Sequence, residues 1–282
     1  MVELAVTALD CAVLADGLTY PESPRYYDRL IYLSDVYAYQ VLSVTLAGTV
    51  RPHRRLPGRP AGLGKLPDGR LVVATALDHR VVALTASPGG DQLHADLSPM
   101  VTGLLNDMIV DGAGRCWVGD TGHLLGQPSQ PGRLIRVDPD GTATVVAEDV
   151  AFPNGLVLLP NGTRLLVAET FGRCITSFEV TAAGELARRT VLCRLDGIPD
   201  GMCLDTLGRV WVAMPELERV DVIDLGGVHV ASYTTPGWRP VACNFVGPDR
   251  SQLLVCLSQQ DQSIRRGRLV VARPGSRGAG VP

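Results

Sequence analysis

A short apolar pattern occurs six times along this chain, at intervals of 41 to 49 residues. Each copy has a turn, usually an arginine, and then an apolar triplet that begins at position 30, 71, 116, 165, 210 or 253. Each triplet is typical of a short buried strand bounded by Gly, Asp, Asn or Pro. A second, alternating strand follows each triplet, as in "HRVVALT" and "GRLIRVDP". Four short strands therefore fit within each repeat.

Six four-stranded units can bury their apolar faces by packing radially around one axis. We therefore predict an all-β fold, a six-bladed β-propeller with four-stranded blades, as a single domain over residues 1–272. A pair of β-sandwiches is the structural alternative, but six nearly equal repeats fit it poorly. The tail "RPGSRGAGVP", residues 273–282, has the composition of a disordered segment.

The overall composition narrows the classes of partner. The 282 residues carry a net charge of −3 and no basic stripe, which argues against nucleic acid as a partner. No apolar run approaches the roughly 18 residues that a membrane helix needs, so we expect no membrane partner. Seven cysteines form an odd set without a C-x-x-C pair, which favours a reducing cytoplasm over a disulfide framework. The oligomeric state stays open.

Polar residues recur at one phase of the repeat. Glu22 lies eight residues before its triplet, Asn106 and Asp200 lie ten before, and Asn154 lies eleven before. Because the innermost strand of each blade starts at one end of the central channel, residues of equal phase converge on the axis. Two carboxylates and two amide oxygens make a hard-oxygen site for a divalent cation, and Ca²⁺ fits best, with Mg²⁺, Mn²⁺ or Zn²⁺ as alternatives.

A purely structural interpretation competes with the metal site. Asn154 in "PNG" and Asp200 in "PDG" could be turn formers alone, because these tripeptides favour turns. Asn161 also lies in a "PNG", four residues before its triplet, and we assign it to a hairpin turn. In the two remaining repeats the matching positions are near Ala61 or Gly62 and at Cys243.

Four stretches carry a resemblance to a known family: "ESPRYYDRLIYLSDV", "LNDMIVDGAGRCWVGD", "FPNGLVLLPNGTRLLVAET" and "IPDGMCLDTLGRVWVA". Together they resemble the gluconolactonase/regucalcin-like family, which includes luciferin-regenerating enzymes. The resemblance implies one catalytic divalent ion on the axis and hydrolysis of a lactone or related ester. It also implies direct ligation by Glu22, Asn154 and Asp200, with Asn106 as a fourth ligand or a substrate contact and Asp200 as the general base.

The chain departs from the family pattern at two places. Leu104 stands where sugar-lactonase members have an arginine, and Gly119-Asp120-Thr121 replaces their usual "GTM". Loss of the arginine removes a bidentate clamp for sugar hydroxyls, so we expect a substrate less polar than a gluconolactone. The predicted substrate pocket comprises Leu104, Met108, Asp120, His123, Phe152 and Phe171, with Trp238 and Tyr37 as further candidates.

These observations predict a metal-dependent hydrolase that opens a small-molecule lactone or ester with a metal-activated water. The predicted catalytic residues are Asp200, Asn106 and Asp107, with Asp200 or Asp107 taking the proton. No G-x-S-x-G motif supports a serine nucleophile. Two alternatives stay open: other chemistry on the same metal platform, such as phosphotriester hydrolysis or an isomerase or cyclase step, and a non-catalytic calcium-binding propeller.

Overall fold

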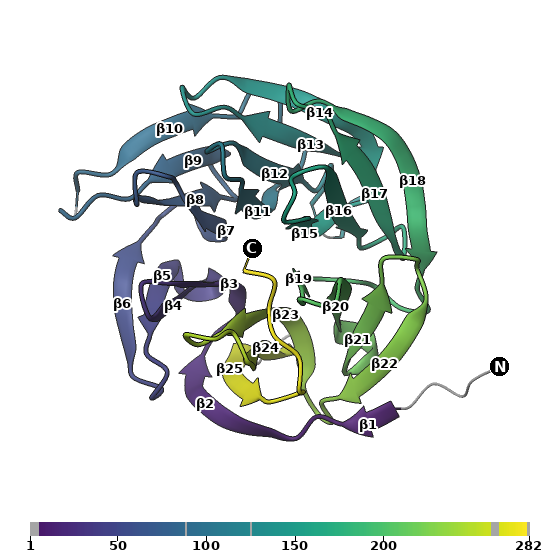
Figure 1. Ribbon diagram of the computed structural model, residues 1–282. Coiled ribbons are helices and arrows are strands. Elements are labelled where there is room, and N and C mark those ends of the chain that lie inside the picture. The colour runs from purple at the N-terminus through teal and green to yellow at the C-terminus, as the bar shows by residue number, and fades with distance from the viewer. Residues whose placement is uncertain (1–5, 88, 125, 261–264, 281–282) are drawn as a thin grey trace.

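Six sheets surround a central axis in the computed structural model, which describes residues 6–87, 89–124, 126–260 and 265–280 (Figure 1). The predicted all-β, six-bladed β-propeller is confirmed. In these ranges the only helical elements are two short 3₁₀ turns, η1 (Val36–Ala38) and η2 (Pro215–Leu217). None of the described helices is long and apolar enough to cross a membrane.

Each blade is a meander of four antiparallel strands whose first strand lies next to the axis. Blade 1 contains β3 (Pro21–Tyr27), β4 (Leu30–Asp35), β5 (Gln40–Val44) and β6 (Val50–Arg55). Blade 2 contains β7 (Pro60–Lys65), β8 (Leu71–Thr75), β9 (Arg80–Ala83) and β10 (Gln92–Asp96). Blade 3 contains β11 (Leu105–Val110), β12 (Cys116–Asp120), β13 (Gly132–Val137) and β14 (Ala143–Val150). Blade 4 contains β15 (Pro153–Leu158), β16 (Arg164–Glu169), β17 (Cys174–Val180) and β18 (Leu186–Arg194). Blade 5 contains β19 (Met202–Leu204), β20 (Arg209–Met214), β21 (Arg219–Asp224) and β22 (His229–Thr234). Blade 6 contains β23 (Arg239–Val246), β24 (Gln252–Gln260) and β25 (Arg265–Ala272).

The N-terminal segment closes the ring. Strand β2 (Cys11–Leu18) pairs antiparallel with β25 and supplies the fourth strand of blade 6. Strand β1 (Val6–Ala8) pairs in parallel with β22 as a fifth strand of blade 5. Because the first and last parts of the chain share one sheet, the ring closes through backbone hydrogen bonds and leaves fewer unpaired strand edges.

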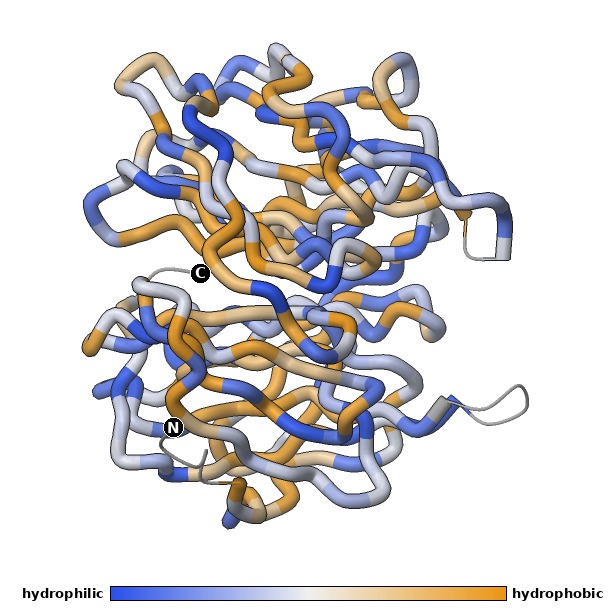
Figure 2. Tube along the Cα trace, turned by 90° about the vertical axis from the view of Figure 1, so that its right-hand side faces the viewer, coloured by the Kyte–Doolittle hydropathy of each residue, from blue (hydrophilic) through white to orange (hydrophobic). Residues whose placement is uncertain are grey.

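The six apolar triplets form the second strand of each blade, and the core lies around them. Ile31, Val73, Val118, Leu166 and Val212 are fully buried in these strands. Side chains alternate between the two faces of a strand, so both faces pack against neighbouring blades. Seen from the side, hydrophobic and hydrophilic stretches alternate along the same chain path (Figure 2).

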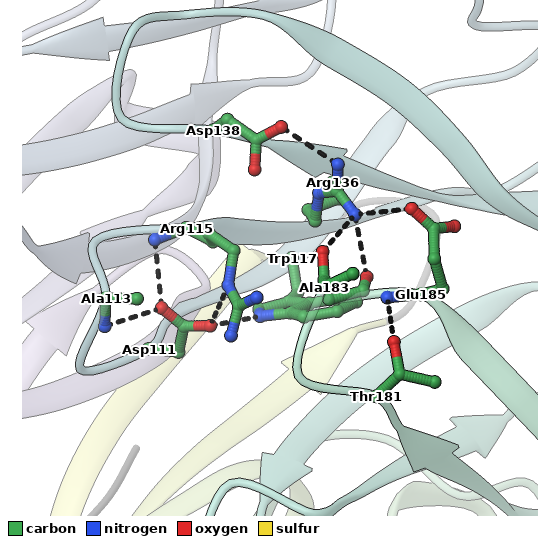
Figure 3. Close-up of polar contacts among 10 residues, drawn as sticks. Asp111, Ala113, Arg115, Trp117, Arg136, Asp138, Thr181, Ala183 and Glu185 are labelled. Atoms are coloured by element: carbon green, nitrogen blue, oxygen red, sulfur yellow. Dashed lines mark hydrogen bonds and ion pairs between the residues drawn. The ribbon is translucent and has the colours of Figure 1, made fainter.

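Blades 3 and 5 each contain the same polar cluster, which we call the clasp: an aspartate that binds a turn arginine and a buried tryptophan. Asp111 accepts hydrogen bonds from the Arg115 backbone N–H (3.0 Å), Arg115 Nε (2.7 Å) and Trp117 Nε1 (3.2 Å), as Figure 3 shows. In blade 5, Asp205 accepts the equivalent bond from Trp211 Nε1 at 3.0 Å. One carboxylate thus closes the turn and satisfies an indole N–H that would otherwise be buried without a partner.

Arg136 joins blade 3 to blade 4 beside this clasp (Figure 3). Its Nη1 donates to the Gly184 carbonyl (2.8 Å) and to Glu185 Oε1 (3.0 Å), and its Nη2 donates to Asp138 Oδ2 (2.9 Å). The guanidinium therefore fixes the turn between β17 and β18 against the third strand of the preceding blade.

The C-terminal tail runs toward the centre of the ring (Figure 1). The Thr206 N–H donates to the Arg277 carbonyl (2.8 Å), and the Ala279 N–H donates to the Leu204 carbonyl (2.9 Å). Ser276 is buried and accepts a hydrogen bond from Arg209 Nη2 at 2.6 Å. Residues 276–279 of the tail, where the sequence predicts disorder, thus form hydrogen bonds with blades 5 and 6 in the structure. Residues 281 and 282 lie outside the described residues.

Candidate active site

The six innermost strands begin around one cavity of about 290 Å³. The tail pairs with Leu204 and Thr206 at the far end of β19, so this cavity is at the opposite end of the channel. The four residues predicted to share a phase all line it: Glu22, Asn106, Asn154 and Asp200. The structure therefore brings these side chains together from blades 1, 3, 4 and 5.

A proline marks the start of most innermost strands and gives the phase more reliably than the apolar triplets do. Pro21, Pro60, Pro153 and Pro199 directly precede Glu22, Ala61, Asn154 and Asp200, and Pro240 precedes Val241. Ala61 lines the cavity, as expected from its position. The assignment of Cys243 to this phase is wrong, because Cys243 is buried with its Sγ 3.6 Å from Cys203 Sγ.

Glycine after the site residue reflects close packing of the inner strands. A Cβ on Gly155 would lie 2.5 Å from the Asp200 carbonyl oxygen, and one on Gly201 would lie 2.7 Å from Ala242 Cα. Neither glycine has a positive φ, whereas Gly162 has a φ of +70°. The turn interpretation of "PNG" at 153–155 and "PDG" at 199–201 therefore fails, because these glycines make room for a neighbouring backbone.

Hydrogen bonds hold the two amide side chains, that of Asn106 to the next blade and that of Asn154 within its own blade. Asn106 Nδ2 donates to the Pro153 carbonyl (3.2 Å), and Asn154 Nδ2 donates to Thr170 Oγ1 (3.3 Å). Thr170 Oγ1 in turn donates to the Pro199 carbonyl at 2.9 Å. Because the amide nitrogens are used in this way, each side chain keeps its oxygen as the atom for a ligand.

Both carboxyl groups have raised pKa values in this cavity, where Asp200 is buried and Glu22 is half-buried. Burial raises the pKa of Asp200 to about 8, and Asp107 adds to the shift, while the Asn154 side chain and Arg239 oppose it. Burial also raises the pKa of Glu22 well above its usual range, and the Asp200 and Asp107 charges raise it further. A divalent cation would reverse both effects by stabilising the charged forms.

Asp107 lies in the same cavity but has other partners. Its Oδ1 accepts hydrogen bonds from Ser23 Oγ (2.6 Å), Arg25 Nη2 (3.1 Å) and the Met108 N–H (2.8 Å). Asp107 and Arg25 are both buried, so this ion pair links blades 1 and 3 beside the axis. Asp107 therefore acts first as a structural counter-charge.

The donor set fits a hard divalent cation. Within the described residues, Asp200 Oδ1 is buried and has no hydrogen-bond partner, which is costly unless a ligand binds it. Among the residues that the structure describes, no three or more His, Cys, Asp or Glu side chains form a group suited to a metal. Two carboxylates with two amide oxygens are instead the ligand chemistry of Ca²⁺ or a similar ion.

Aromatic side chains form one wall of the cavity. The rings of Phe152 and Phe171 lie 4.8 Å apart, and the His123 ring lies 5.6 Å from each of them. Leu104, His123, Phe152 and Phe171, all predicted pocket residues, line this cavity together with Tyr37. The structure thus places an apolar surface beside the four oxygen donors.

Two predicted pocket residues lie elsewhere. Met108 is fully buried in the core between blades 2 and 3. Asp120 is also fully buried, and it accepts hydrogen bonds from the backbone N–H groups of Thr102, Gly103 and Gly122 at 2.9–3.0 Å. Their assignment to the pocket is wrong, because Met108 fills the core and Asp120 anchors two loops. Trp238 likewise packs under the Arg268 guanidinium, 3.9 Å from its ring centre.

Two basic residues of the cavity are absent from the pocket predicted from the sequence. Arg59 and Arg239 line it from blades 2 and 6. Both directly precede a proline that starts an innermost strand, Pro60 and Pro240. This Pro marker could have identified them, whereas the position of the apolar triplets does not.

Comparisons with known proteins agree with this architecture. A family model described as "SMP-30/Gluconolactonase/LRE-like region" matches residues 20–259. A pentonolactonase of Haloferax volcanii is 32% identical over 160 residues, covering 55% of this chain and 54% of that protein. A 6-deoxy-6-sulfogluconolactonase of Pseudomonas putida is 29% identical over 164 residues, covering 56% of this chain and 55% of that protein. The matched part thus spans about half the length of these relatives.

Among solved structures, a calcium-binding protein, regucalcin, from Agrobacterium tumefaciens superposes with a TM-score of 0.86. The superposition covers 99% of both chains at 23% sequence identity. At this identity the likeness establishes the fold and does not extend to the activity.

Proposed function

Because the chain belongs to the SMP-30/gluconolactonase/LRE-like family, we propose that it is a metal-dependent hydrolase that opens a lactone or related ester with water. The observation that carries this proposal is the pair of carboxyl groups with raised pKa values, Glu22 and Asp200, beside two amide side chains in one cavity. Relatives named as a pentonolactonase and a sulfogluconolactonase support lactone hydrolysis.

The oxygens of Glu22, Asn154 and Asp200, with Asn106 as a fourth donor, would hold the cation. A divalent ion bound there would supply Lewis acidity to the lactone carbonyl and lower the pKa of a water molecule. Ca²⁺ is the ion that this donor set favours. Asn106 can serve as this fourth donor or as a substrate contact, because its amide nitrogen donates to the Pro153 carbonyl and its oxygen is left for a ligand in the cavity.

Asp200 is the proton acceptor in this proposal. The water oxygen attacks the carbonyl carbon, Asp200 takes the water proton, and the ring C–O bond breaks. The proton then passes to the departing alkoxide, so the product is a hydroxy acid. Asp107 is the weaker candidate, because its Oδ1 already accepts three hydrogen bonds, whereas Asp200 Oδ1 has no partner among the described residues.

A substrate panel with controlled cation content tests this function. The purified protein is treated with chelator, dialysed, and assayed on lactones, aryl esters and phosphotriesters, with Ca²⁺, Mg²⁺, Mn²⁺ and Zn²⁺ added back separately. We expect lactone turnover to disappear with chelation and to return with Ca²⁺. Turnover that is unaffected by chelation would exclude the metal-dependent mechanism, and a strong preference for phosphotriesters would favour other chemistry on the same platform.

A further inference from the structure

A second ring of residues lies two positions before the site residues, at the entrance of the cavity. We call it the mouth ring: Tyr20, Arg59, Leu104, Phe152, Ile198 and Arg239. All six are half-buried and all six line the cavity. Each of the six lies at or just before the start of an innermost strand, and all of them line the same cavity as the oxygen donors.

The mouth ring has polar side chains on one half and apolar side chains on the other. The innermost strands contact one another in chain order, and β23 contacts β3, so blade 6 is next to blade 1. Three consecutive blades, 6, 1 and 2, present Arg239, Tyr20 and Arg59. The next three present only apolar residues, which are Leu104, Phe152 and Ile198. The entrance therefore has one cationic half and one apolar half.

The two mouth arginines lack the partners that Arg25 has in the same channel. Arg25 forms a buried ion pair with Asp107 at 3.1 Å. Neither Arg59 nor Arg239 has a side-chain hydrogen bond or an ion pair within 4.0 Å in the described part of the chain, and Arg59 Nε is buried and unpaired. A half-buried guanidinium without a carboxylate is an unfilled site for an anion.

The charge count of the cavity leads to the same conclusion. Three carboxylates, Glu22, Asp107 and Asp200, line the cavity together with two guanidinium groups, Arg59 and Arg239, while Arg25 reaches Asp107 through an ion pair. Arg25 and Asp107 neutralise each other. A divalent cation would neutralise Glu22 and Asp200, and the two mouth arginines would then give the entrance an excess of positive charge. Such a cleft concentrates anions.

We propose that this site takes an anionic substrate, a lactone or ester whose carboxylate binds Arg59 and Arg239 while its apolar part contacts Leu104, Phe152 and Ile198. The reacting class rests on the proposed function, whereas the anion subsite rests on the mouth ring alone. The planar guanidinium fork matches a carboxylate in two parallel hydrogen bonds, and a sulfonate offers similar oxygens.

The first experiment measures selectivity. It compares kcat/KM for a γ-lactone carboxylate, the matching sulfonate and the matching carboxamide, in wild type and in Arg59→Gln and Arg239→Gln. We expect the anionic lactones to be preferred, and each variant to lower the anionic-to-neutral ratio about 10-fold. Because Arg239 also influences Asp200, any rate loss common to all substrates cancels in the ratio. An unchanged ratio in both variants would overturn the proposal.

Arg29→Gln is the matched control. Arg29 has the same backbone φ as Arg59, +64°, but it is exposed and lies outside the cavity. We expect this variant to keep the wild-type ratio. If Arg29→Gln lowers the ratio as much as Arg59→Gln does, the effect is one of net charge and the proposed subsite is wrong.

A second experiment does not depend on catalysis. Calorimetry with Ca²⁺ present compares tetrahydrofuran-2-carboxylate with tetrahydrofuran-2-carboxamide, two rings that cannot be hydrolysed. We expect the carboxylate to bind at least about 10-fold more tightly and the double arginine variant to lose this difference. If calorimetry shows carboxylate binding but the substrate panel shows no lactone turnover, the proposed function is refuted and the anion subsite is supported. Equal binding of the two rings, or carboxylate binding that ignores both arginines, would refute the subsite.

Discussion

Asn154 and Asn161 each lie in a Pro-Asn-Gly tripeptide, one at the start of strand β15 and one just after its end, and only Asn154 lines the cavity. Asn161 accepts hydrogen bonds from the backbone N–H (3.2 Å) and the Oγ1 (2.9 Å) of Thr163, which closes a hairpin turn. Gly162 has a φ of +70° in that turn, whereas Gly155 is packed against the backbone of Asp200. One tripeptide therefore has two different roles in one blade.

Alanine variants of these two asparagines test the cation site, and each variant serves as the control for the other. Asn154→Ala removes an amide oxygen from the cavity, and we expect Ca²⁺ affinity measured by calorimetry to fall about 10-fold or more, in line with the loss of one charge-assisted contact of 1.5–3 kcal/mol. Asn161→Ala should leave Ca²⁺ affinity unchanged and lower the free energy of unfolding by about 1 kcal/mol through loss of the turn contacts. Equal Ca²⁺ affinity in both variants would remove Asn154 from the ligand set.

Asp200→Asn separates charge from shape at the proposed base. The variant keeps the side-chain size and one oxygen but loses the charge and the proton-accepting group. We expect kcat for a lactone, at saturating cation, to fall by about 10²–10⁴. In chelator, thermal unfolding should occur at the same or a higher temperature, because the buried charge next to Glu22 is gone. Wild-type turnover in this variant would exclude Asp200 as the base.

Leu104→Arg tests the apolar half of the mouth ring. An arginine at this position adds hydrogen-bond donors next to Phe152, and we expect relative kcat/KM to shift toward hydroxylated lactones such as gluconolactone. Leu93→Arg adds the same charge on exposed strand β10, outside the cavity, and should leave the substrate profile unchanged. If wild type already prefers gluconolactone over apolar lactones, the expectation of a less polar substrate is wrong.

Asp221 and Asp196 both pair with Arg219 and differ in burial. Asp221 is fully buried: burial alone would raise its pKa, but hydrogen bonds from His229, Ser232 and Arg219 lower it below the usual value. Asp196 is largely exposed and lies 2.8 Å from Arg219. We expect Asp221→Asn to lower the free energy of unfolding by about 3 kcal/mol and Asp196→Asn by less than about 1 kcal/mol.

The pH dependence of the same variants follows from the direction of the shift. A pKa lowered by folding stabilises the protein at pH values above the ordinary aspartate pKa of 3.8, and this contribution is lost as the pH falls through the folded value. Urea unfolding at pH 7, 5 and 3 should therefore show a large difference between wild type and Asp221→Asn that shrinks at pH 3. A difference that stays constant with pH would mean that the Asp221 charge contributes nothing.

Several site residues could be predicted without the fold because the repeat is radial. Equal phase in six blades becomes convergence on one axis, so Glu22, Asn106, Asn154 and Asp200 could be grouped from their spacing alone. The prediction of Cys243 failed because the spacing between the site residue and the apolar triplet varies between repeats, whereas a proline directly precedes the site position in five of the six repeats.

The repeat, the four-stranded blades and the convergence of the oxygen donors could be predicted from the sequence alone, because these features depend on periodicity and on symmetry. Tertiary structure decided which neighbouring side chains enter the cavity. The pairing of β11 with β12 shifts register between Leu105 and Met108, and this irregularity breaks the simple alternation that would have placed Met108. The two arginines that blades 2 and 6 bring to one entrance, Arg59 and Arg239, are distant in sequence. Only closure of the ring places them together, because such contacts depend on the final packing of the blades and not on local pattern.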